Sequence, residues 1–369
     1  MCFFEKISFD NKGRSAVLPL TQLKNIAVAM SGGVDSSVTA ALLKKQGHKV
    51  QGVFMALAQP DLDAQIARVK GVADFLGIGL TVVDLAALFK REVLDYFCDS
   101  YFAGKTPNPC VVCNRRVKFG GLLDFVRAEL AADLLATGHY ARIEADGAGC
   151  RLLKGKDNTK DQSYFLSRLT QAQLARLCFP LGELRKKEVY LLAAELGLSG
   201  RHGSESQDVC FLKNQSVADF LAAHSAKSKK TGAIVTVDGR RLGSHQGVCS
   251  YTVGQRRGLG IPDATPYYVV GLDPVNNQVI VGKDEDLWHD TLLVAEMNWS
   301  AGVAPELPAV FDVKIRYRHG GARAQVIGGD DGRIEVKFVE PQRAITPGQF
   351  AVFYQGDQVV GGGEIAGVG

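Results

Sequence analysis

Residues 26 to 37 have the sequence Ile26-Ala27-Val28-Ala29-Met30-Ser31-Gly32-Gly33-Val34-Asp35-Ser36-Ser37. A short apolar run stops at a turn rich in glycine and serine, and a second apolar segment follows from Val38 to Leu43. This order predicts a buried parallel strand, a tight loop and the start of a helix. Gly32 and Gly33 permit positive φ angles and a close approach of the backbone to a ligand.

The loop is expected to bind an anion. Free N–H groups at a helix start, together with nearby hydroxyl groups, suit a phosphate or pyrophosphate. The loop has neither the lysine of a Walker sequence nor the G-x-G-x-x-G spacing of a dinucleotide site. A plain turn with Asp35 or Ser36 as the N-cap is the alternative, but two glycines and three serines exceed what a cap requires.

The composition indicates a globular protein of several domains. A chain of 369 residues suggests two or three domains, and 46% hydrophobic with 22% charged residues is ordinary for such proteins. Because the net charge is only +4, any surface for nucleic acid must be a local patch. Eight cysteines in a chain of this length favour reduced thiols over a disulfide framework. Without an apolar stretch of transmembrane length, we expect a cytoplasmic protein with no membrane partner.

The chain is expected to divide into an α/β part and two β-rich parts. Strands and helices alternate after the first loop, which predicts a doubly wound parallel sheet. Later, short strands between Gly, Pro and Asp turns predict two small β units, the last a barrel. Leu184 to Leu196 predicts a helix whose basic start faces solvent. The expected bounds are 1–21 for an N-terminal extension, 22–222 for the catalytic domain, and 223–287 and 288–369 for the β-rich domains.

Ligands of parallel α/β sheets bind beyond the carboxyl ends of the strands. Met55 ends the second predicted strand and either contacts an adenine or packs in the core. Gly138 follows another predicted strand and would permit a close approach to the nucleotide. His139 is either a site residue or a core histidine, and taken alone the core interpretation is favoured.

Cys113 is the first candidate nucleophile. Two prolines precede it, and a helix is expected to start around Cys113 or Asn114. A thiol at a helix start beside Arg115, Arg116 and Lys118 should have a lowered pKa, as a nucleophile requires.

Cys210 lies in a polar loop and is the second candidate. Two thiols from distant loops can pass sulfur by persulfide and disulfide chemistry. Cys110 and Cys113 also form a C-x-x-C, and with Cys210 they could hold zinc or an iron–sulfur cluster. No second C-x-x-C or nearby His completes such a site, so metal is the less favoured alternative. The other cysteines are expected to be packed or incidental: Cys2, Cys98, Cys150, Cys178 and Cys249.

An ordered set of motifs resembles the tRNA-specific 2-thiouridylase family (MnmA, or TrmU) of the N-type ATP pyrophosphatase superfamily. The resemblance covers roughly residues 23 to 365. The motifs are Ser31–Ser37, Asn108–Asn114, Thr137–Tyr140, Lys160–Leu166, Ser206–Phe211, Thr252–Gly260, Arg316–Arg318 and Pro347–Tyr354. The resemblance implies an adenine nucleotide alpha hydrolase-like fold and ATP-dependent 2-thiolation of the wobble uridine in tRNA. It implies adenylation of the base O2, sulfur transfer from a cysteine persulfide, and release of AMP and pyrophosphate.

The resemblance also implies roles for individual residues. It makes Cys113 the nucleophile and Cys210 the carrier of the persulfide. The implied ATP contacts are Ala29, Met30, Ser31, Gly32, Gly33, Val34, Asp35, Ser36, Met55 and Gly138. The implied contacts to the target base are Asn108, Pro109 and Cys110, where many members have Asp at the third position. The implied tRNA contacts are His139, Lys160, Asp161, Gln162, Arg316, Tyr317 and Gln349. The expected cofactors are ATP and Mg²⁺, and the expected partners are tRNA and a persulfide donor protein, with the enzyme itself a monomer.

Two other functions fit part of the sequence. An ATP pyrophosphatase acting on a small molecule, such as an amidating or argininosuccinate-type synthetase, would need neither Cys113 nor Cys210. A non-catalytic RNA-binding or sulfur-relay protein would need no pyrophosphate loop. Arginines beside glycines and aromatics at 255–260 and 316–319 favour an RNA ligand over a metabolite.

Overall fold

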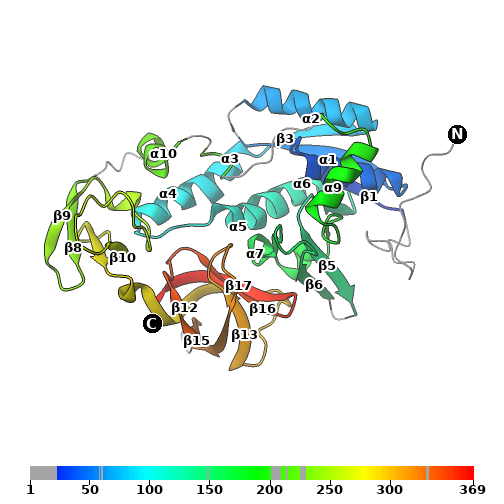
Figure 1. The fold of residues 1–369 in the computed structure, drawn as a ribbon. Helices are drawn as coiled ribbons and strands as arrows, with labels where there is room; N and C mark the ends of the chain where they lie inside the picture. Colours follow the sequence, from blue (N-terminus) through cyan, green and yellow to red (C-terminus); the bar gives the residue numbers. More distant parts are fainter. Residues whose placement is uncertain are drawn as a thin grey trace. The chain divides into compact units, whose positions relative to one another are not determined.

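The computed structural model describes residues 23–57, 59, 61–147, 149–200, 209–212, 215–224, 230–329 and 332–369 (Figure 1). The extension expected at 1–21 and the motif residues 206–208 lie outside this part of the chain. The chain forms two compact units. Unit 1 comprises the described residues of Met1–Ala86, Phe119–Ser163 and Ala172–Glu205, and unit 2 those of Ala87–Lys118, Tyr164–Gln171 and Ser206–Gly369. The predicted domain bounds stay a prediction.

Unit 1 is built on a parallel sheet with the strand order β3-β2-β1-β4-β7. Its strands are β1 (Asn25–Ala29), β2 (Lys49–Ala56), β3 (Gly79–Asp84), β4 (Leu134–Ala136) and β7 (Leu177–Cys178). The strand order reverses at β1, whose neighbours are β2 and β4. Ligands of such sheets bind at this switch point, beyond the carboxyl ends of the strands. The predicted parallel α/β fold is confirmed.

Helices bury the central strand of this sheet. Val28 of β1 shares one core with Val38, Val69 and Val189, which lie on three different helices. The apolar run that forms β1 is therefore buried, as expected for a central parallel strand. The helices of unit 1 are α1 (Val34–Lys45), α2 (Leu62–Leu76), α6 (Leu122–Glu129) and α9 (Lys186–Glu195). An antiparallel hairpin of β5 (Ala141–Asp146) and β6 (Gly149–Lys154) follows β4.

Unit 2 opens with helices that pack through aromatic rings. Phe97 and Tyr101 share a core with Phe220 and Phe211. Its helices are the π-helix η1 (Lys90–Leu94), α4 (Asp95–Phe102), α5 (Pro109–Cys113) and α10 (Val217–His224), with short turns η3 (Val248–Ser250) and η4 (Glu285–Leu287). The elements at the unit boundaries are α3 (Ala86–Phe89), the π-helix η2 (Asn114–Gly121), α7 (Ser163–Leu166) and α8 (Gln171–Leu174). Among the described residues, no helix has both the length and the apolar composition needed to cross a bilayer.

Two β structures complete unit 2. The first is a sheet with the order β10-β11-β8-β9, and the second is an antiparallel barrel with the order β12-β15-β14-β13-β16-β17, closed by pairing of β12 with β17. The strands of the sheet are β8 (Gly232–Thr236), β9 (Arg241–His245), β10 (Tyr268–Asp273) and β11 (Gln278–Gly282). The strands of the barrel are β12 (Trp288–Trp299), β13 (Ala309–Lys314), β14 (Ala322–Gly328), β15 (Ile334–Arg343), β16 (Phe350–Gln355) and β17 (Gln358–Val368). The predicted β-rich region ending in a barrel is confirmed.

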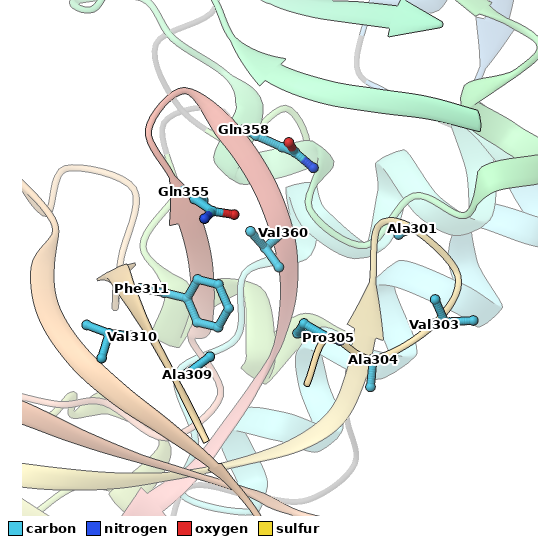
Figure 2. A pocket seen from close by; sticks show the side chains of 10 residues that line it. All are labelled: Ala301, Val303, Ala304, Pro305, Ala309, Val310, Phe311, Gln355, Gln358 and Val360. Atoms are coloured by element: carbon cyan, nitrogen blue, oxygen red, sulfur yellow. The ribbon is translucent and has the colours of Figure 1, made fainter. Parts of the chain in front are cut away.

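A cavity of about 490 Å³ opens on the barrel (Figure 2). Its lining consists of Ala301, Val303, Ala304, Pro305, Ala309, Val310, Phe311, Gln355, Gln358 and Val360. These side chains carry no charge, and no predicted site residue is among them. The cavity is therefore separate from the candidate site described next.

Candidate functional site

The predicted anion loop connects β1 to α1. Gly32 adopts a φ of +76°, and a Cβ added there would lie 3.2 Å from the side chain of Val69. Gly33 is the N-cap of α1 in an extended conformation, with φ −84° and ψ 164°. Of the two glycines, Gly32 alone uses a positive φ, so the prediction holds for one position. The helix begins at Val34, so Asp35 and Ser36 are not its N-cap.

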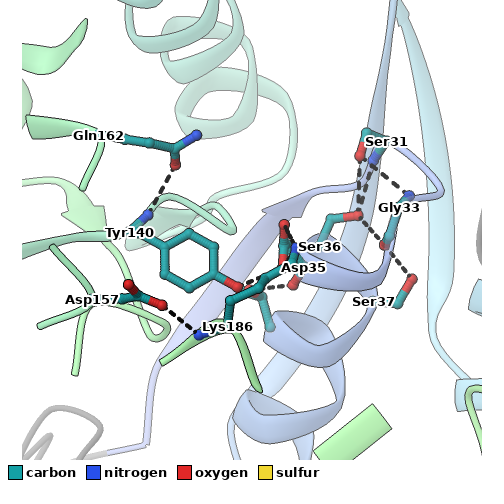
Figure 3. A network of polar contacts seen from close by, with 10 residues as sticks. Ser31, Gly33, Asp35, Ser36, Ser37, Tyr140, Asp157, Gln162 and Lys186 are labelled. Atoms are coloured by element: carbon teal, nitrogen blue, oxygen red, sulfur yellow. Dashed lines mark hydrogen bonds and ion pairs between the residues drawn. The ribbon is translucent and has the colours of Figure 1, made fainter. Parts of the chain in front are cut away.

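Serine hydroxyls fix the shape of this loop (Figure 3). Ser31 accepts a hydrogen bond from the Gly33 N–H at 3.3 Å, and its own N–H donates to Ser36 Oγ at 3.2 Å. The hydroxyls of Ser36 and Ser37 donate to the Gly33 carbonyl at 3.1 and 2.9 Å. The first N–H groups of a helix have no intrahelical partner and attract negative charge. The loop thus has the shape expected of an anion-binding turn, and binding of an anion stays a prediction.

Lys186 is the main residue that the sequence interpretation missed. Its Nζ lies 2.8 Å from both carboxylate oxygens of Asp35, and Tyr140 Oη donates to one of them at 2.7 Å (Figure 3). The Lys186 side chain is 9% exposed, so the predicted solvent-facing start of this helix is wrong at this position. The reason is that Lys186 is the first residue of α9, which packs against α1. A positive charge at the start of a helix is electrostatically unfavourable. The position of Lys186 in the sequence could therefore have indicated that it pairs with a carboxylate.

This ion pair neutralises the carboxylate of the loop. The backbone N–H of Lys186 donates to Asp157 at 2.9 Å. Burial alone would raise the pKa of Asp157, but hydrogen bonds from Lys186 and Thr159 lower it. Asp157 therefore stays ionised and holds the start of α9 in place. With Asp35 neutralised by Lys186, the loop can accept a polyphosphate without repulsion from its own carboxylate.

Gly138 and Met55, two predicted ATP contacts, flank the loop. A Cβ at Gly138 would lie 2.8 Å from Asp35 Cβ and 3.1 Å from the Ser36 nitrogen. The glycine is thus required for the end of β4 to approach the loop. Met55 is half-buried in β2, one residue before the strand ends at Ala56. Contact of either residue with a nucleotide stays a prediction.

His139 is packed by its own unit. Its ring centroid lies 5.6 Å from those of Phe119 and Phe179, and its Nδ1 lies 2.6 Å from Thr137 Oγ1. These contacts match the core-histidine interpretation that the residue favours when taken alone. A contact with tRNA stays a prediction.

The predicted tRNA-binding turn Lys160 to Gln162 is held by internal hydrogen bonds. Asp161 is 6% exposed and accepts hydrogen bonds from the N–H groups of Gly155 and Ser163 at 3.0 and 3.1 Å. Gln162 Oε1 accepts from the Tyr140 N–H at 3.0 Å. Asp161 and Gln162 therefore shape the turn, whatever their role towards RNA.

Unit 2 carries the predicted thiols. Helix α5 begins at Pro109 with Asn108 as its N-cap, so the helix start expected at Cys113 or Asn114 is wrong. Proline suits the first helical position because its missing N–H has no partner there in any case. Cys113 is the last residue of α5, and the π-helix η2 continues from Asn114. Segments of π-helix occur frequently at functional sites.

The pKa expected for Cys113 is also wrong. Burial raises the pKa of its thiol to about 12, Lys118 opposes this shift, and Cys210 and Cys110 add to it. The surrounding protein displaces water from Cys113, which disfavours the charged thiolate. Lys118 is held in place by Asn114, whose Oδ1 lies 3.0 Å from its Nζ. The thiol is therefore protonated at neutral pH.

Three thiols share one neighbourhood in unit 2. Loss of hydration is the largest cause that raises the pKa of the Cys110 thiol, and Cys210 raises it further. Cys110 nevertheless has a solvent-exposed surface. Cys110, Cys113 and Cys210 thus act electrostatically on one another, and none of the three is in a disulfide. Even so, among the described residues no three His, Cys, Asp or Glu side chains are arranged to hold a metal ion.

An aromatic anchor positions Cys210. The ring of the next residue, Phe211, lies 5.1 Å from Phe97, 5.0 Å from Phe220 and 5.9 Å from Phe89. Such edge and tilted ring pairs contribute beyond the area that they bury. The anchor fixes the backbone at Cys210 while its thiol stays exposed.

The β structures of unit 2 hold the segment that leads into α5. Gln349 Nε2 donates to the Thr106 carbonyl at 2.9 Å, and Thr252 Oγ1 lies 3.1 Å from Thr106 Oγ1. Glu364 forms an ion pair with Lys105 at 2.7 Å. Gln349, a predicted tRNA contact, thus also supports the approach to Cys113.

Arg316 and Tyr317 are the remaining predicted tRNA contacts. Arg316 is exposed and donates to the Arg343 carbonyl at 3.2 Å. The Tyr317 ring lies 4.4 Å from the ring of Phe165. An exposed guanidinium beside aromatic rings is a suitable surface for an unpaired base, and its use by RNA stays a prediction.

Three family models match successive parts of the chain. The tRNA methyl transferase HUP domain matches residues 24–214, and the tRNA methyl transferase PRC-barrel domain matches residues 218–283. The aminomethyltransferase beta-barrel domain matches residues 289–365.

Curated relatives are similar over nearly the whole chain. The tRNA-specific 2-thiouridylase MnmA of Desulfotalea psychrophila is 49% identical over 344 residues, which cover 93% of this chain and 99% of that protein. The protein of the same name from Geobacter metallireducens is 49% identical over 359 residues, covering 93% of this chain and 96% of that protein. Among solved structures, a 4-thiouridine synthetase–RNA complex with bound ATP is 20% identical, with a TM-score of 0.37 over 51% of this chain and 44% of that chain. This last likeness is too weak for a comparison of sites.

Proposed function

The chain belongs to the tRNA-specific 2-thiouridylase family and is a tRNA sulfurtransferase, and we propose that it performs ATP-dependent 2-thiolation of the wobble uridine. The observation that carries this proposal is the presence of two kinds of site in one chain. A formed loop with a buried lysine lies in unit 1, and three neighbouring cysteines that are not in disulfides lie in unit 2. An ATP-dependent synthetase for a small molecule would need no such thiols, and a passive RNA binder would need no such loop.

In the first step, ATP is bound by its phosphates at the start of α1, near Lys186. The O2 oxygen of the target uridine attacks the α-phosphate, and pyrophosphate leaves. The product is a base whose C2 carries AMP as a good leaving group. An enzyme that reacts with a base must have it outside the helical stack, which suits an anticodon-loop uridine.

Mg²⁺ would neutralise phosphate charge when it accompanies ATP. The loop's carboxylate, Asp35, is already bound by Lys186 and Tyr140, so it does not fit the role of a metal ligand in this arrangement. The residues Cys110, Cys113 and Cys210 do not fit an iron–sulfur cluster either, because the described residues contain no group of three metal-ligating side chains. The proposed steps require no metal held by the protein.

In the second step, a persulfide on Cys210 supplies its outer sulfur to C2. A C–S bond forms, the C–O bond to AMP breaks, and the S–S bond of the persulfide breaks. The Cys113 thiol gives up its proton and its sulfur bonds to Cys210, leaving a disulfide. An external dithiol must then reduce this disulfide to restore both thiols.

Exposure of Cys210 supports loading of the persulfide by a separate donor protein. Cys113 is protonated until it is needed, because burial raises its pKa. The donor protein and the monomeric state of the enzyme stay predictions.

The test is nucleoside mass spectrometry of tRNA after incubation with the protein, ATP and a persulfide donor. We expect 2-thiouridine at the wobble position, and pyrophosphate release that depends on added tRNA. Release of pyrophosphate without tRNA would favour the small-molecule synthetase. Modification that needs a methyl donor in place of ATP would favour the methyl transfer named in the family models, and either result would overturn the proposal.

A further inference from the structure

Trp288 places a large aromatic ring on the surface of unit 2. It is the first residue of β12 and is 47% exposed. Its indole Nε1 donates a hydrogen bond to a carboxylate oxygen of Asp284 at 3.2 Å, so the ring is held by its edge. A single exposed apolar side chain needs no explanation by itself. The case for a function rests on the residues that lie beside this ring.

Arg343 is the direct neighbour of Trp288 in the barrel. The antiparallel register of β12 and β15 pairs these two residues, which places their side chains next to each other on one face. Nε and Nη2 of Arg343 donate to the other oxygen of Asp284 at 3.0 and 2.8 Å. The Arg343 guanidinium also lies 5.0 Å from the centre of the Tyr268 ring. One carboxylate thus orients both an indole and a guanidinium, and we call Trp288, Arg343 and Asp284 the Trp288 platform.

The Trp288 platform adjoins a residue that is already expected to contact tRNA. Arg316 is exposed and donates through Nη1 to the Arg343 carbonyl at 3.2 Å. Trp288 is therefore connected to Arg316 through the backbone and the side chain of one residue, Arg343. A strand of RNA bound at Arg316 would have the platform as its neighbour.

A second arginine motif approaches the same place. A Cβ added to Gly254 would lie 2.9 Å from the Cβ of Ala344, the residue that follows Arg343. Arg256 and Arg257 are exposed and follow Gly254 by two and three residues. The two arginine-bearing segments that the sequence analysis singled out, at 255–260 and 316–319, thus both adjoin the chain at Arg343 and Ala344.

The charges assign different parts of a nucleotide to different parts of this surface. Asp284 is 53% exposed, and Glu285, which follows it, is also exposed. These carboxylates would repel a phosphate placed over the indole, whereas the arginines attract phosphate oxygens. The face of an aromatic ring accepts any base, because every base has a π-face. The surface therefore fits a base on Trp288 and phosphates on the arginines.

We propose that Trp288 stacks on an unpaired base of the tRNA, with the flanking phosphates bound by Arg256, Arg257 and Arg316. RNA outside its helices is recognised by stacking of its bases on aromatic rings and guanidinium planes. The inference rests on the proposed function, because it takes tRNA as the substrate. It adds a binding contact that takes no part in the chemical steps.

The first test observes the stacking directly, because the chain contains only two tryptophans. The other one, Trp299, packs against Phe353 with their ring centres 5.9 Å apart. In Trp299→Phe all tryptophan emission comes from Trp288, and tRNA should quench it strongly. In Trp288→Phe all of it comes from Trp299, and tRNA should change it little. Absence of quenching in Trp299→Phe at saturating tRNA would overturn the inference.

The second test is the affinity for tRNA over a range of salt concentrations. Trp288→Ala removes a ring and no charge, so affinity should fall about tenfold while the salt slope is unchanged. Trp288→Phe keeps a ring and should retain most of the affinity. Arg256→Gln/Arg257→Gln should weaken binding and reduce the slope by about one to two units.

Val237→Ala is the matched control for loss of an exposed apolar side chain. Val237 is 64% exposed between β8 and β9, and its truncation should change neither the affinity nor the slope. Melting temperatures show which variants are folded. If Trp288→Ala is unfolded, the fluorescence of Trp299→Phe and the affinity of the arginine variant still decide the question.

The outcomes separate this inference from the function on which it rests. If the wild type binds no tRNA, the proposed function fails. If the wild type binds tRNA but Trp288→Ala keeps its affinity and Trp288 is not quenched, the stacking contact alone is overturned. If Trp288→Ala binds tRNA normally but no longer accepts sulfur from the donor protein, the surface serves that protein and the inference is likewise overturned.

Discussion

The nucleotide loop of unit 1 and the thiols of unit 2 differ in how far each is prepared for its reaction. The loop is complete: serine hydroxyls fix its turn, and Lys186 neutralises Asp35 at 2.8 Å. The Cys113 thiol, in contrast, is held in its protonated form, because burial raises its pKa to about 12 and Lys118 offsets this only in part.

This difference follows from the chemistry of the two ligands. Fixed dipoles and one buried cation can bind a phosphate without any change in the protein. A preformed thiolate, in contrast, would react with oxidants before the substrate arrived. The pair of sites therefore indicates an enzyme whose nucleotide site is ready and whose sulfur chemistry awaits a further event.

The largest expected effect is the loss of thiolation without loss of ATP binding when either thiol of unit 2 is removed. Cys113→Ser or Cys210→Ser should reduce thiolation about a thousandfold or more, because each removes a sulfur that must form or break a bond. ATP affinity should stay within about twofold, since neither thiol belongs to the loop. Thiolation is measured by nucleoside mass spectrometry, and ATP binding by calorimetry. Cys150→Ser, on the β5–β6 hairpin, is the control, and full activity in either catalytic variant would refute the proposed sulfur transfer.

The next effect tests whether the loop depends on its distant lysine. Lys186→Met leaves Asp35 unpaired beside the phosphates, and we expect ATP affinity to fall about tenfold to a hundredfold. The free energy of unfolding should fall by about 2–3 kcal/mol, at the low end for a broken buried pair because Asp35 is 26% exposed. Lys187→Met changes the exposed neighbour and should alter neither quantity.

A second variant sharpens this result. Adding Asp35→Asn to Lys186→Met removes the orphaned charge and should restore part of the stability, as measured by denaturant unfolding. Equal stability of Lys186→Met and the wild type would show that the ion pair does not hold the loop.

A smaller effect is expected from the close approach of β4 to the loop. Gly138→Ala places a Cβ 2.8 Å from Asp35 Cβ, so the start of α1 must shift. Overpacking of this kind costs about 1–3 kcal/mol of stability, and ATP affinity should fall by about tenfold. Gly71→Ala in α2 meets nothing within 4 Å and should be neutral or stabilising by up to about 1 kcal/mol. Stability is measured by thermal unfolding and ATP affinity by titration. Equal values for Gly138→Ala and Gly71→Ala would contradict the prediction.

The smallest effect concerns the protonation of Cys113. With a pKa of about 12, its alkylation by iodoacetamide should rise about tenfold for each pH unit from 8 to 11. Lys118→Met removes the cation that lowers this pKa, so alkylation at pH 8 should slow by about threefold to tenfold. Alkylation of Cys150 serves as the internal reference. A rate for Cys113 that levels off near pH 8 would contradict a protonated resting thiol.

The same shift affects stability. The folded state holds the Cys113 proton more tightly than the unfolded state, whose thiol has a pKa near 9.0. The stabilisation is therefore complete below about pH 9 and is lost as the pH rises towards 12. Cys113→Ser should remove this part of the alkaline decline in melting temperature.

The sequence predicted the features that depend on near neighbours. β1, the anion turn and α1 follow from an apolar run, two glycines and a helical pattern within twenty residues. The Lys186–Asp35 pair joins residues 151 positions apart, and no local pattern specifies such a contact. The predicted pKa of Cys113 was wrong for a related reason, because one of the groups that raise it, Cys210, is distant in sequence.

Strand β17 shows the same limit in the barrel. Its run Gly361-Gly362-Gly363 has low strand propensity, and no strand was predicted there. A Cβ at Gly361 would lie 2.5 Å from the Asn298 carbonyl of the neighbouring strand β12, with which β17 is paired. Glycine is required by the close approach of these two strands where the barrel closes, which is a property of the closed sheet and not of the segment itself.

The support of the segment before α5 has a consequence for biosynthesis. Thr106 is held by Thr252 and Gln349, and Lys105 by Glu364, which lies 259 positions later in the chain. The loop at Ser31 to Ser37 has its own partner, Lys186, much earlier. A nascent chain therefore acquires every residue of its nucleotide turn well before the partners that position the approach to Cys113. A chain that stopped before Gln349 would therefore contain its nucleotide turn but would lack this support of the segment before α5.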